Sequence, residues 1–144
     1  MIYWLTGQPG AGKTTLATWM QSSFPNKSMI VDGDDLREIF INKDYSEQGR
    51  RKNIEKAQIL AKFLHHKGYT VIVSLVSPFR DQREEFKVEM GDDLVEIYVH
   101  TQNVRGRESF HVNYEEPLSF FIDCDTTDSS EYHTFLELRK KLKI

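Results

Sequence analysis

Cysteine is almost absent from this chain, whose 144 residues include only Cys124. A single thiol excludes an internal disulfide and suits a reducing cytoplasm. Long apolar runs are also lacking, since none approaches the roughly 20 residues that cross a bilayer. Residues 1–6 lead directly into a glycine-rich loop and contain no secretory signal. These absences predict a cytoplasmic protein with no membrane partner, in which Cys124 packs in the core.

An excess of one charge is missing as well. The 19 lysines and arginines stand against 22 aspartates and glutamates, which gives a formal net charge of −3. This balance provides no global attraction to nucleic acid. Two basic clusters remain, at residues 50–52 and 139–141. The second ends an amphipathic helical pattern, where the helix dipole favours positive charge.

Strand and helix patterns alternate along the chain, with no repeat, low-complexity tract or linker between them. The strand patterns are short runs of β-branched and aromatic residues, separated by helical patterns of ten or more residues. They cover residues 2–6, 28–31, 70–75 and 94–99, with a fifth in 119–123. The alternation predicts an α/β fold in which helices cover both faces of a mostly parallel sheet of about five strands. The length fits a single domain over 1–144.

Two helices have recognisable ends in the sequence. Apolar residues at helical spacing predict a helix over residues 53–67, which stops at Gly68. Asp128 and Glu131 have the spacing of a capping box, which predicts that the last helix starts near Asp128.

The strongest motif is residues 7–14, which read GQPGAGKT and match the phosphate-loop pattern G-x-x-x-x-G-K-[ST] between a strand and a helix. Its backbone N–H groups and the positive end of the helix favour phosphate oxygens, which indicates a P-loop NTPase-type three-layer fold. Lys13 is expected to bridge the β- and γ-phosphates of ATP, and Thr14 to bind Mg²⁺. The expected ATP-binding residues are Gly7, Gly10, Ala11, Gly12, Lys13, Thr14 and Thr15.

Polar segments follow the other predicted strands. Ligands of a doubly wound sheet bind beyond the carboxyl ends of its strands, so we expect these segments to share one rim. Phosphoryl transfer to a hydroxyl requires a carboxylate that orients or deprotonates the attacking oxygen. We assign that role to Asp34. Lys13 is the second predicted catalytic residue. Asp32 is expected to reach the metal ion through water, and Arg37 to hold a polar part of the acceptor.

Several of these residues have a purely structural alternative. Asp34 could instead be the N-cap of a helix, and Arg37 could form a surface salt bridge. Ser77, followed by proline, has the pattern of another N-cap. In the helix that follows, Arg83 is expected to be solvated, while Arg80 is expected either to be solvated or to contact phosphate.

Residues 101–117 form a polar stretch without a clear period. A loop this long in a compact domain is usually functional or disordered. It carries two arginines and three rings that the rim could use, namely Arg105, Arg107, Phe110, His111 and Tyr114. Whether it closes over ATP is left open by the sequence.

Together these motifs resemble those of the adenylylsulfate (APS) kinases, which transfer the γ-phosphate of ATP to the 3′-hydroxyl of adenosine 5′-phosphosulfate. The resemblance covers roughly residues 2–100 and comprises the phosphate loop, segments 32–37 and 74–80, and the polar residues between 45 and 54. It implies a kinase that uses ATP and Mg²⁺, with Asp34 acting at the acceptor hydroxyl. The acceptor-binding residues that it implies are Asp34, Arg37, Tyr45, Arg50, Asn53, Val76, Ser77 and Phe110. Among these, Tyr45 and Phe110 would stack on the acceptor base.

Three departures from the family pattern keep other acceptors open. Gly49 and Lys52 stand where the family has acidic residues, and the long lid of the family is reduced to residues 104–114. A more open site beside the basic residues 50–52 also suits a kinase that phosphorylates the hydroxymethyl group of a modified pyrimidine (5-hydroxymethyluracil) in phage DNA. The net acidic charge weighs against DNA, so the small sulfonucleotide is preferred. A nucleotide-binding switch without transfer activity is the third hypothesis. A homodimer is compatible with the sequence, but no pattern indicates one.

Overall fold

Five parallel strands form one sheet in the order β2-β3-β1-β4-β5. The computed structural model describes residues 1–103 and 108–144. The strands are β1 Ile2–Thr6, β2 Ser28–Asp32, β3 Thr70–Ser74, β4 Leu94–His100 and β5 Ile122–Asp125. This arrangement confirms the predicted α/β class and places the earliest strand of the chain at the centre of the sheet.

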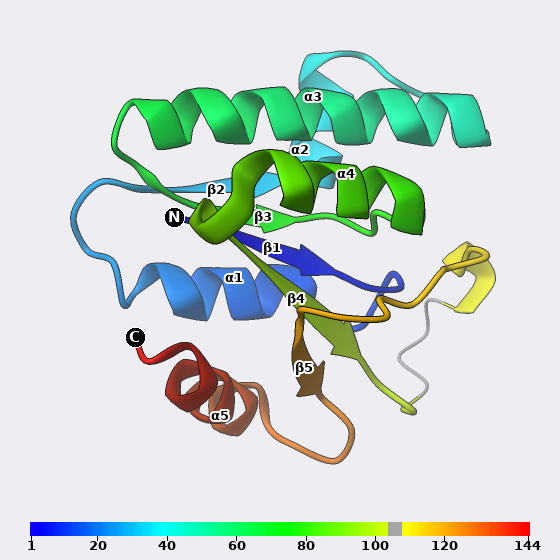
Figure 1. The fold of residues 1–144 in the computed structure, drawn as a ribbon. Coiled ribbons are helices and arrows are strands. Elements are labelled where there is room, and N and C mark those ends of the chain that lie inside the picture. Colours follow the sequence, from blue (N-terminus) through cyan, green and yellow to red (C-terminus); the bar gives the residue numbers. More distant parts are fainter. Residues whose placement is uncertain (104–107) are drawn as a thin grey trace.

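Helices cover both faces of the sheet, as Figure 1 shows. They are α1 Lys13–Gln21, α2 Gly33–Ile39, α3 Glu47–His66, α4 Arg80–Met90 and α5 Glu131–Leu142, with short 3₁₀ turns η1 Gly91–Asp93 and η2 Glu108–Phe110. Helices α1 and α5 pack on one face, and α2, α3 and α4 on the other. The three-layer α/β/α architecture is therefore confirmed.

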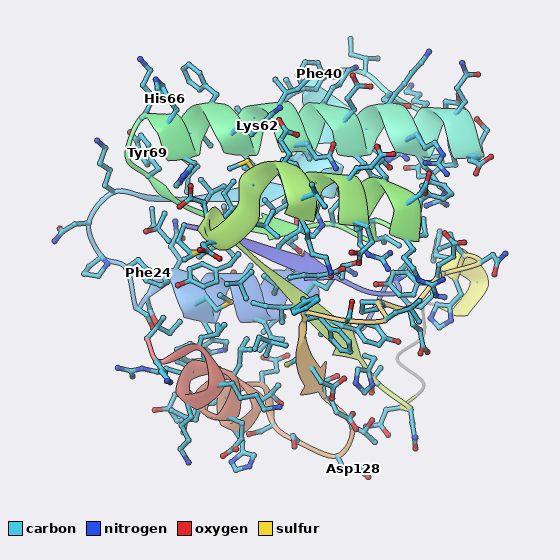
Figure 2. The ribbon with its side chains drawn as sticks, in the orientation of Figure 1. Phe24, Phe40, Lys62, His66, Tyr69 and Asp128 are labelled. Carbon is cyan, nitrogen blue, oxygen red and sulfur yellow. The ribbon has the colours of Figure 1, made fainter. Side chains whose placement is uncertain are left out.

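Strand β1 is buried on both of its sides, which explains its uninterrupted apolar sequence. Tyr3 and Leu5 point into the core under α1 and α5, while Ile2 and Trp4 point into the core under α3 and α4. Phe24, labelled in Figure 2, stacks on Tyr3 with ring centroids 5.6 Å apart and closes the edge of the first core. Alternate residues of one strand thus serve two separate cores.

Several element boundaries differ from those that the sequence predicts, most clearly the starts of α3 and β5. Helix α3 begins at Glu47, where the Ser46 hydroxyl accepts a hydrogen bond from the Gly49 amide at 3.2 Å. Its first turns are polar, so apolar periodicity alone located its start too late. Strand β5 begins at Ile122, three residues later than predicted, because Phe120 has a φ of 53° and lies outside the strand.

The predicted capping box of the last helix is also wrong. Ser130 is the N-cap, and its hydroxyl accepts from the His133 amide at 3.1 Å. Glu131 is already the first helical residue, and Asp128 lies outside the helix with a φ of 55°.

Within the described residues, no helix combines the length and apolar character needed to cross a membrane.

Candidate functional site

The phosphate loop lies between β1 and α1, and its glycines are required by the backbone. Gly7 has a φ of 150°, and a Cβ atom there would lie 2.0 Å from the carbonyl oxygen of Val99. Gly10 and Gly12 have φ values of 82° and 103°, and Gly12 is the N-cap of α1. These left-handed conformations turn the chain sharply enough to present the start of α1 to a ligand.

Lys13 is held inside this loop. It is the first residue of α1 and is 8% exposed. Its Nζ atom donates to the carbonyl oxygens of Gly7 at 3.0 Å and Gln8 at 2.9 Å. The ammonium group therefore stays beside the N-terminus of α1. The helix dipole favours an anionic ligand at the same place.

The next residue, Thr14, connects the loop to the ends of β2 and β3. Its hydroxyl donates to Asp32 Oδ2 at 3.1 Å and lies 3.3 Å from the Ser74 hydroxyl. The other carboxylate oxygen of Asp32 accepts from the Asp34 amide at 2.9 Å. Asp32 is therefore the N-cap of α2, and the N-cap alternative for Asp34 is wrong. Ser74 received no role from the sequence, because its position beside Thr14 depends on the pairing of β1 with β3.

The donor set at this point suits Mg²⁺. A threonine hydroxyl and a nearby carboxylate are hard oxygen ligands, which a Mg²⁺ ion uses together with phosphate oxygens and water. Within residues 1–103 and 108–144, no group of three or more His, Cys, Asp or Glu could hold a metal ion. A Mg²⁺ ion at Thr14 and Asp32 would thus depend on the phosphates of the nucleotide for its remaining ligands.

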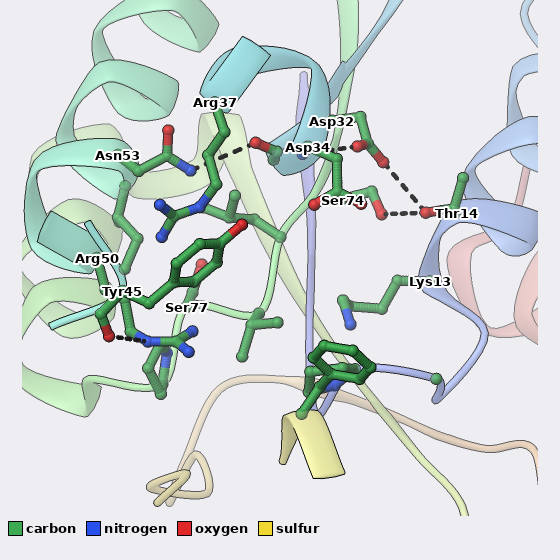
Figure 3. Close-up of a pocket in the computed structure, with 18 of the residues that line it drawn as sticks. Lys13, Thr14, Asp32, Asp34, Arg37, Tyr45, Arg50, Asn53, Ser74 and Ser77 are labelled. Atoms are coloured by element: carbon green, nitrogen blue, oxygen red, sulfur yellow. Dashed lines mark hydrogen bonds between the residues drawn. The ribbon is translucent and has the colours of Figure 1, made fainter. Parts of the chain in front are cut away.

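A cavity of about 600 Å³ opens between the phosphate loop and α3 (Figure 3). It is lined by Gly10, Lys13 and Thr14 of the predicted ATP-binding set, by Asp32, and by all eight predicted acceptor residues, namely Asp34, Arg37, Tyr45, Arg50, Asn53, Val76, Ser77 and Phe110. The other predicted ATP residues, Gly7, Ala11, Gly12 and Thr15, do not line it. The structure thus brings the proposed acceptor side and the end of the phosphate loop into one space.

Two cations surround an aromatic ring in this cavity. The guanidinium carbon of Arg37 lies 4.0 Å from the centre of the Tyr45 ring, and that of Arg50 lies 5.5 Å from it. Arg37 also donates to the Asp44 carbonyl at 3.0 Å, and Arg50 to the Tyr45 carbonyl at 3.0 Å. Burial and the nearby charge of Arg37 lower the pKa of Arg50. Because the two cations repel each other, an anionic ligand would be stabilised here.

Asn53 lines the same cavity. Its side chain is 3% exposed, and its amide nitrogen donates weakly to the Gly33 carbonyl at 3.4 Å. Its Oδ1 atom is buried and has no hydrogen-bond partner among the described residues. The amide nitrogen thus links α3 to Gly33 at the start of α2.

Ser77 lies at the end of the segment that follows β3 and is strained. Its φ is 47°, and its hydroxyl accepts from the Trp4 indole nitrogen at 3.0 Å. Helix α4 starts only at Arg80, with Phe79 as N-cap, so the prediction that Ser77 caps a helix is wrong. A non-glycine residue in this conformation at a cavity wall is typical of binding sites.

The prediction that Arg83 is solvated is also wrong. Arg83 is buried, and its Nε atom lies 2.8 Å from Oε1 of the equally buried Glu96. It donates further to the carbonyl oxygens of Ser77, at 2.6 Å, and of Glu115. Glu96 was the available signal, because a carboxylate inside an otherwise apolar strand requires a cationic partner. Arg80 donates to the Glu116 carbonyl at 2.7 Å.

The long loop after β4 is described only in part. Arg105 and Arg107 lie outside the described residues. Phe110 and His111 line the cavity, whereas His100 pairs with Asp123 at 2.8 Å.

Cys124 is buried in the core as predicted.

Comparisons with known proteins agree with one another. A family model described as adenylylsulphate kinase matches residues 1–112. The probable adenylyl-sulfate kinase of Pyrococcus abyssi is 38% identical, over 86% of this chain and 84% of its own length. The adenylyl-sulfate kinase of Burkholderia ambifaria is 27% identical, over 99% of this chain and 92% of its own length. The match to the Pseudomonas aeruginosa adenylyl-sulfate kinase is 38% identical, but it spans 69% of this chain and 54% of that relative.

Solved structures show the same fold. The APS kinase CysC of Mycobacterium tuberculosis, in complex with AMPPNP and APS, superimposes with a TM-score of 0.83. The alignment covers 99% of this chain and 97% of that chain at 20% sequence identity. At this identity the likeness concerns the fold, and the residues of the cavity must be judged on their own geometry.

Proposed function

The chain belongs to the adenylylsulphate kinase family, and from this premise we propose that it transfers the γ-phosphate of ATP to the 3′-hydroxyl of adenosine 5′-phosphosulfate. One observation carries the proposal: a single cavity contains Lys13 and Thr14 of the phosphate loop together with Asp34 and the cationic pair Arg37 and Arg50. A donor phosphate and an anionic acceptor can therefore approach each other within one protein domain.

The proposed chemistry needs a base close to the acceptor hydroxyl. In Figure 3, Asp34 lies between Thr14 on the donor side and Arg37 on the acceptor side. Its carboxylate would accept the proton of the 3′-hydroxyl as that oxygen bonds to the γ-phosphorus, while the bond from phosphorus to the β-phosphate oxygen breaks. Lys13 would turn from the loop carbonyls to the phosphates and offset their negative charge. Mg²⁺, held by Thr14 and through water by Asp32, would add charge neutralisation.

The acceptor side matches the chemistry of a sulfonucleotide. The mutually repelling guanidinium groups of Arg37 and Arg50 suit its phosphosulfate group. Tyr45 is 61% exposed, so its ring is accessible to a base. Asn53 lines the same space and holds the Gly33 carbonyl, next to Asp34.

The alternative acceptor, a hydroxymethylated pyrimidine in DNA, is less favoured. It is not the acceptor in the name of any relative described above. The basic cluster 50–52 is also partly neutralised, because Arg51 pairs with Asp81 at 3.1 Å and with Glu47 at 3.4 Å. Fewer uncompensated cations at the mouth of the cavity weaken the attraction to a phosphate backbone.

A labelled-phosphate assay tests the proposal. Purified protein receives γ-labelled ATP with either adenosine 5′-phosphosulfate or DNA that contains 5-hydroxymethyluracil, and we expect label only in the sulfonucleotide. Asp34→Asn should lower kcat by roughly 10²- to 10⁴-fold, as loss of a positioned general base does. Asp35→Asn, which changes the adjacent exposed carboxylate, is the matched control. Label in DNA, or none in the sulfonucleotide, would refute the proposal, and full activity of Asp34→Asn would refute the role of Asp34.

A further inference from the structure

The side chain of Gln8, inside the phosphate loop, binds the backbone of a residue 104 positions later. Its Nε2 atom donates to the Val112 carbonyl at 2.7 Å, and its Oε1 atom accepts from the Val112 amide at 3.0 Å. One amide thus satisfies both backbone groups of one residue, in the manner of a neighbouring β-strand. Both hydrogen bonds are partly buried, so they do not compete fully with water.

A second contact fixes the same segment two residues later. The Tyr114 hydroxyl lies 2.7 Å from the Thr6 hydroxyl, at the end of β1. The Tyr114 ring stacks on Tyr98 with centroids 5.6 Å apart, and the Arg83 guanidinium lies over it. Figure 1 shows the chain running back from η2 to β5 past the ends of β1 and β4. The segment 112–114 is therefore bound to Thr6 and Gln8, the two residues that flank Gly7.

This attachment lies directly after three residues of the cavity wall. Ser109, Phe110 and His111 directly precede Val112 and line the cavity. Phe110 is 61% exposed, so its ring is accessible from the cavity. The Gln8 hydrogen bonds are the nearest described contacts that fix the backbone after it.

We propose that Gln8 is a positioning residue for the acceptor: it holds residues 109–111 so that the Phe110 ring faces a bound acceptor across the cavity. The inference rests on the proposed function, since it concerns the acceptor side of that site. The backbone of Gln8 serves the donor side, because its carbonyl accepts from Lys13, while its side chain serves the acceptor side. One residue therefore links the two substrate sites.

The substitution Gln8→Met tests the proposal. Methionine keeps the length of the side chain and removes both hydrogen bonds. We expect the KM for the acceptor to rise about tenfold, as the loss of two hydrogen bonds of ordinary strength predicts, while the KM for ATP changes less than twofold. Gln58→Met is the matched control, since Gln58 makes a similar hydrogen bond, at 3.3 Å to the Gln82 carbonyl, between α3 and α4.

A double-mutant cycle with Phe110→Ala shows whether Gln8 acts through that ring. If it does, Gln8→Met should change the acceptor KM less than twofold in the Phe110→Ala background, because the residue that it positions is gone. Independent full-size effects, or equal rises in both KM values for the single variant, would overturn the proposal.

Amide hydrogen exchange separates this inference from the proposed function. The Val112 amide should be protected in the wild-type protein and exchange at least about tenfold faster in Gln8→Met, whatever the acceptor. Unprotected Val112 in the wild type would overturn the link. If label goes to DNA, the proposed function alone fails and the KM comparison is made with that DNA. If no acceptor takes label, both proposals fail.

Discussion

The buried ion pair between Arg83 and Glu96 allows a quantitative prediction. Their side chains are 2% and 1% exposed and lie 2.8 Å apart. The substitution Arg83→Met removes the cation but keeps a long apolar side chain. Among the described residues, Glu96 then keeps Lys87, 2.6 Å from its other oxygen, as its cationic partner, and the Ser77 carbonyl loses its 2.6 Å hydrogen bond.

The magnitude follows from the charge that remains. Removing one member of a buried pair typically costs about 3–5 kcal/mol, because the other charge stays out of water without compensation. Lys87 compensates part of the Glu96 charge, so we expect the free energy of unfolding to fall by about 3 kcal/mol. For a chain of this size that loss lowers Tm by roughly 6–12 °C.

Urea denaturation of three variants measures the effect. Arg83→Met is compared with the double variant Arg83→Met/Glu96→Met, which removes both charges and should regain at least about half of the loss. Lys140→Met is the control, because Lys140 forms an exposed pair with Glu137 and should change stability by less than about 0.5 kcal/mol. A cost below about 1 kcal/mol for Arg83→Met would refute the reasoning. If the double variant is no more stable than the single one, the loss of stability comes from packing and not from charge.

Three further predictions follow from the described geometry. Gly7→Ala should lower stability by at least about 2 kcal/mol in thermal unfolding, since the added methyl group would lie 2.0 Å from a backbone oxygen of β4. Burial raises the pKa of the Cys124 thiol from 9.0 to about 11; the unfolded chain therefore loses this proton first, and the free energy of unfolding should fall as pH rises from 9 to 11, with a smaller slope in Cys124→Ala. Arg37→Ala and Arg50→Ala should each raise the acceptor KM more than the ATP KM in steady-state kinetics, and a selective loss of ATP affinity would place the acceptor elsewhere.

The parts of this molecule that the sequence predicts are those encoded by local pattern. The phosphate loop depends on glycines at fixed spacing, and the structure places Gly7, Gly10 and Gly12 in the conformations that only glycine adopts readily. The parallel sheet covered by helices also follows from the alternation of strand and helix patterns. The acceptor-side residues were located through family resemblance, and the structure gathers them in one cavity.

The parts that could not be predicted depend on contacts between distant segments. Ser74 meets Thr14 only because β3 lies beside β1. Gln8 occupies a variable position of the loop motif, and nothing local indicates its bond to Val112. Arg83 looks like an ordinary charged residue of a polar helix until Glu96 is seen to face it. In each case the contact depends on how two distant segments pair, and the local hydrophobic pattern of the sequence does not show this.

The central position of β1 also affects how the molecule is made. This strand leaves the ribosome before its two neighbours in the sheet, β3 and β4, which begin at residues 70 and 94. At about 5–20 residues per second, its apolar side chains wait roughly 5–20 s for the second neighbour. During that interval an unpaired, strongly apolar segment is exposed to other nascent chains. Slower translation or a weakened β4 should therefore increase aggregation during synthesis more than it lowers the stability of the finished protein.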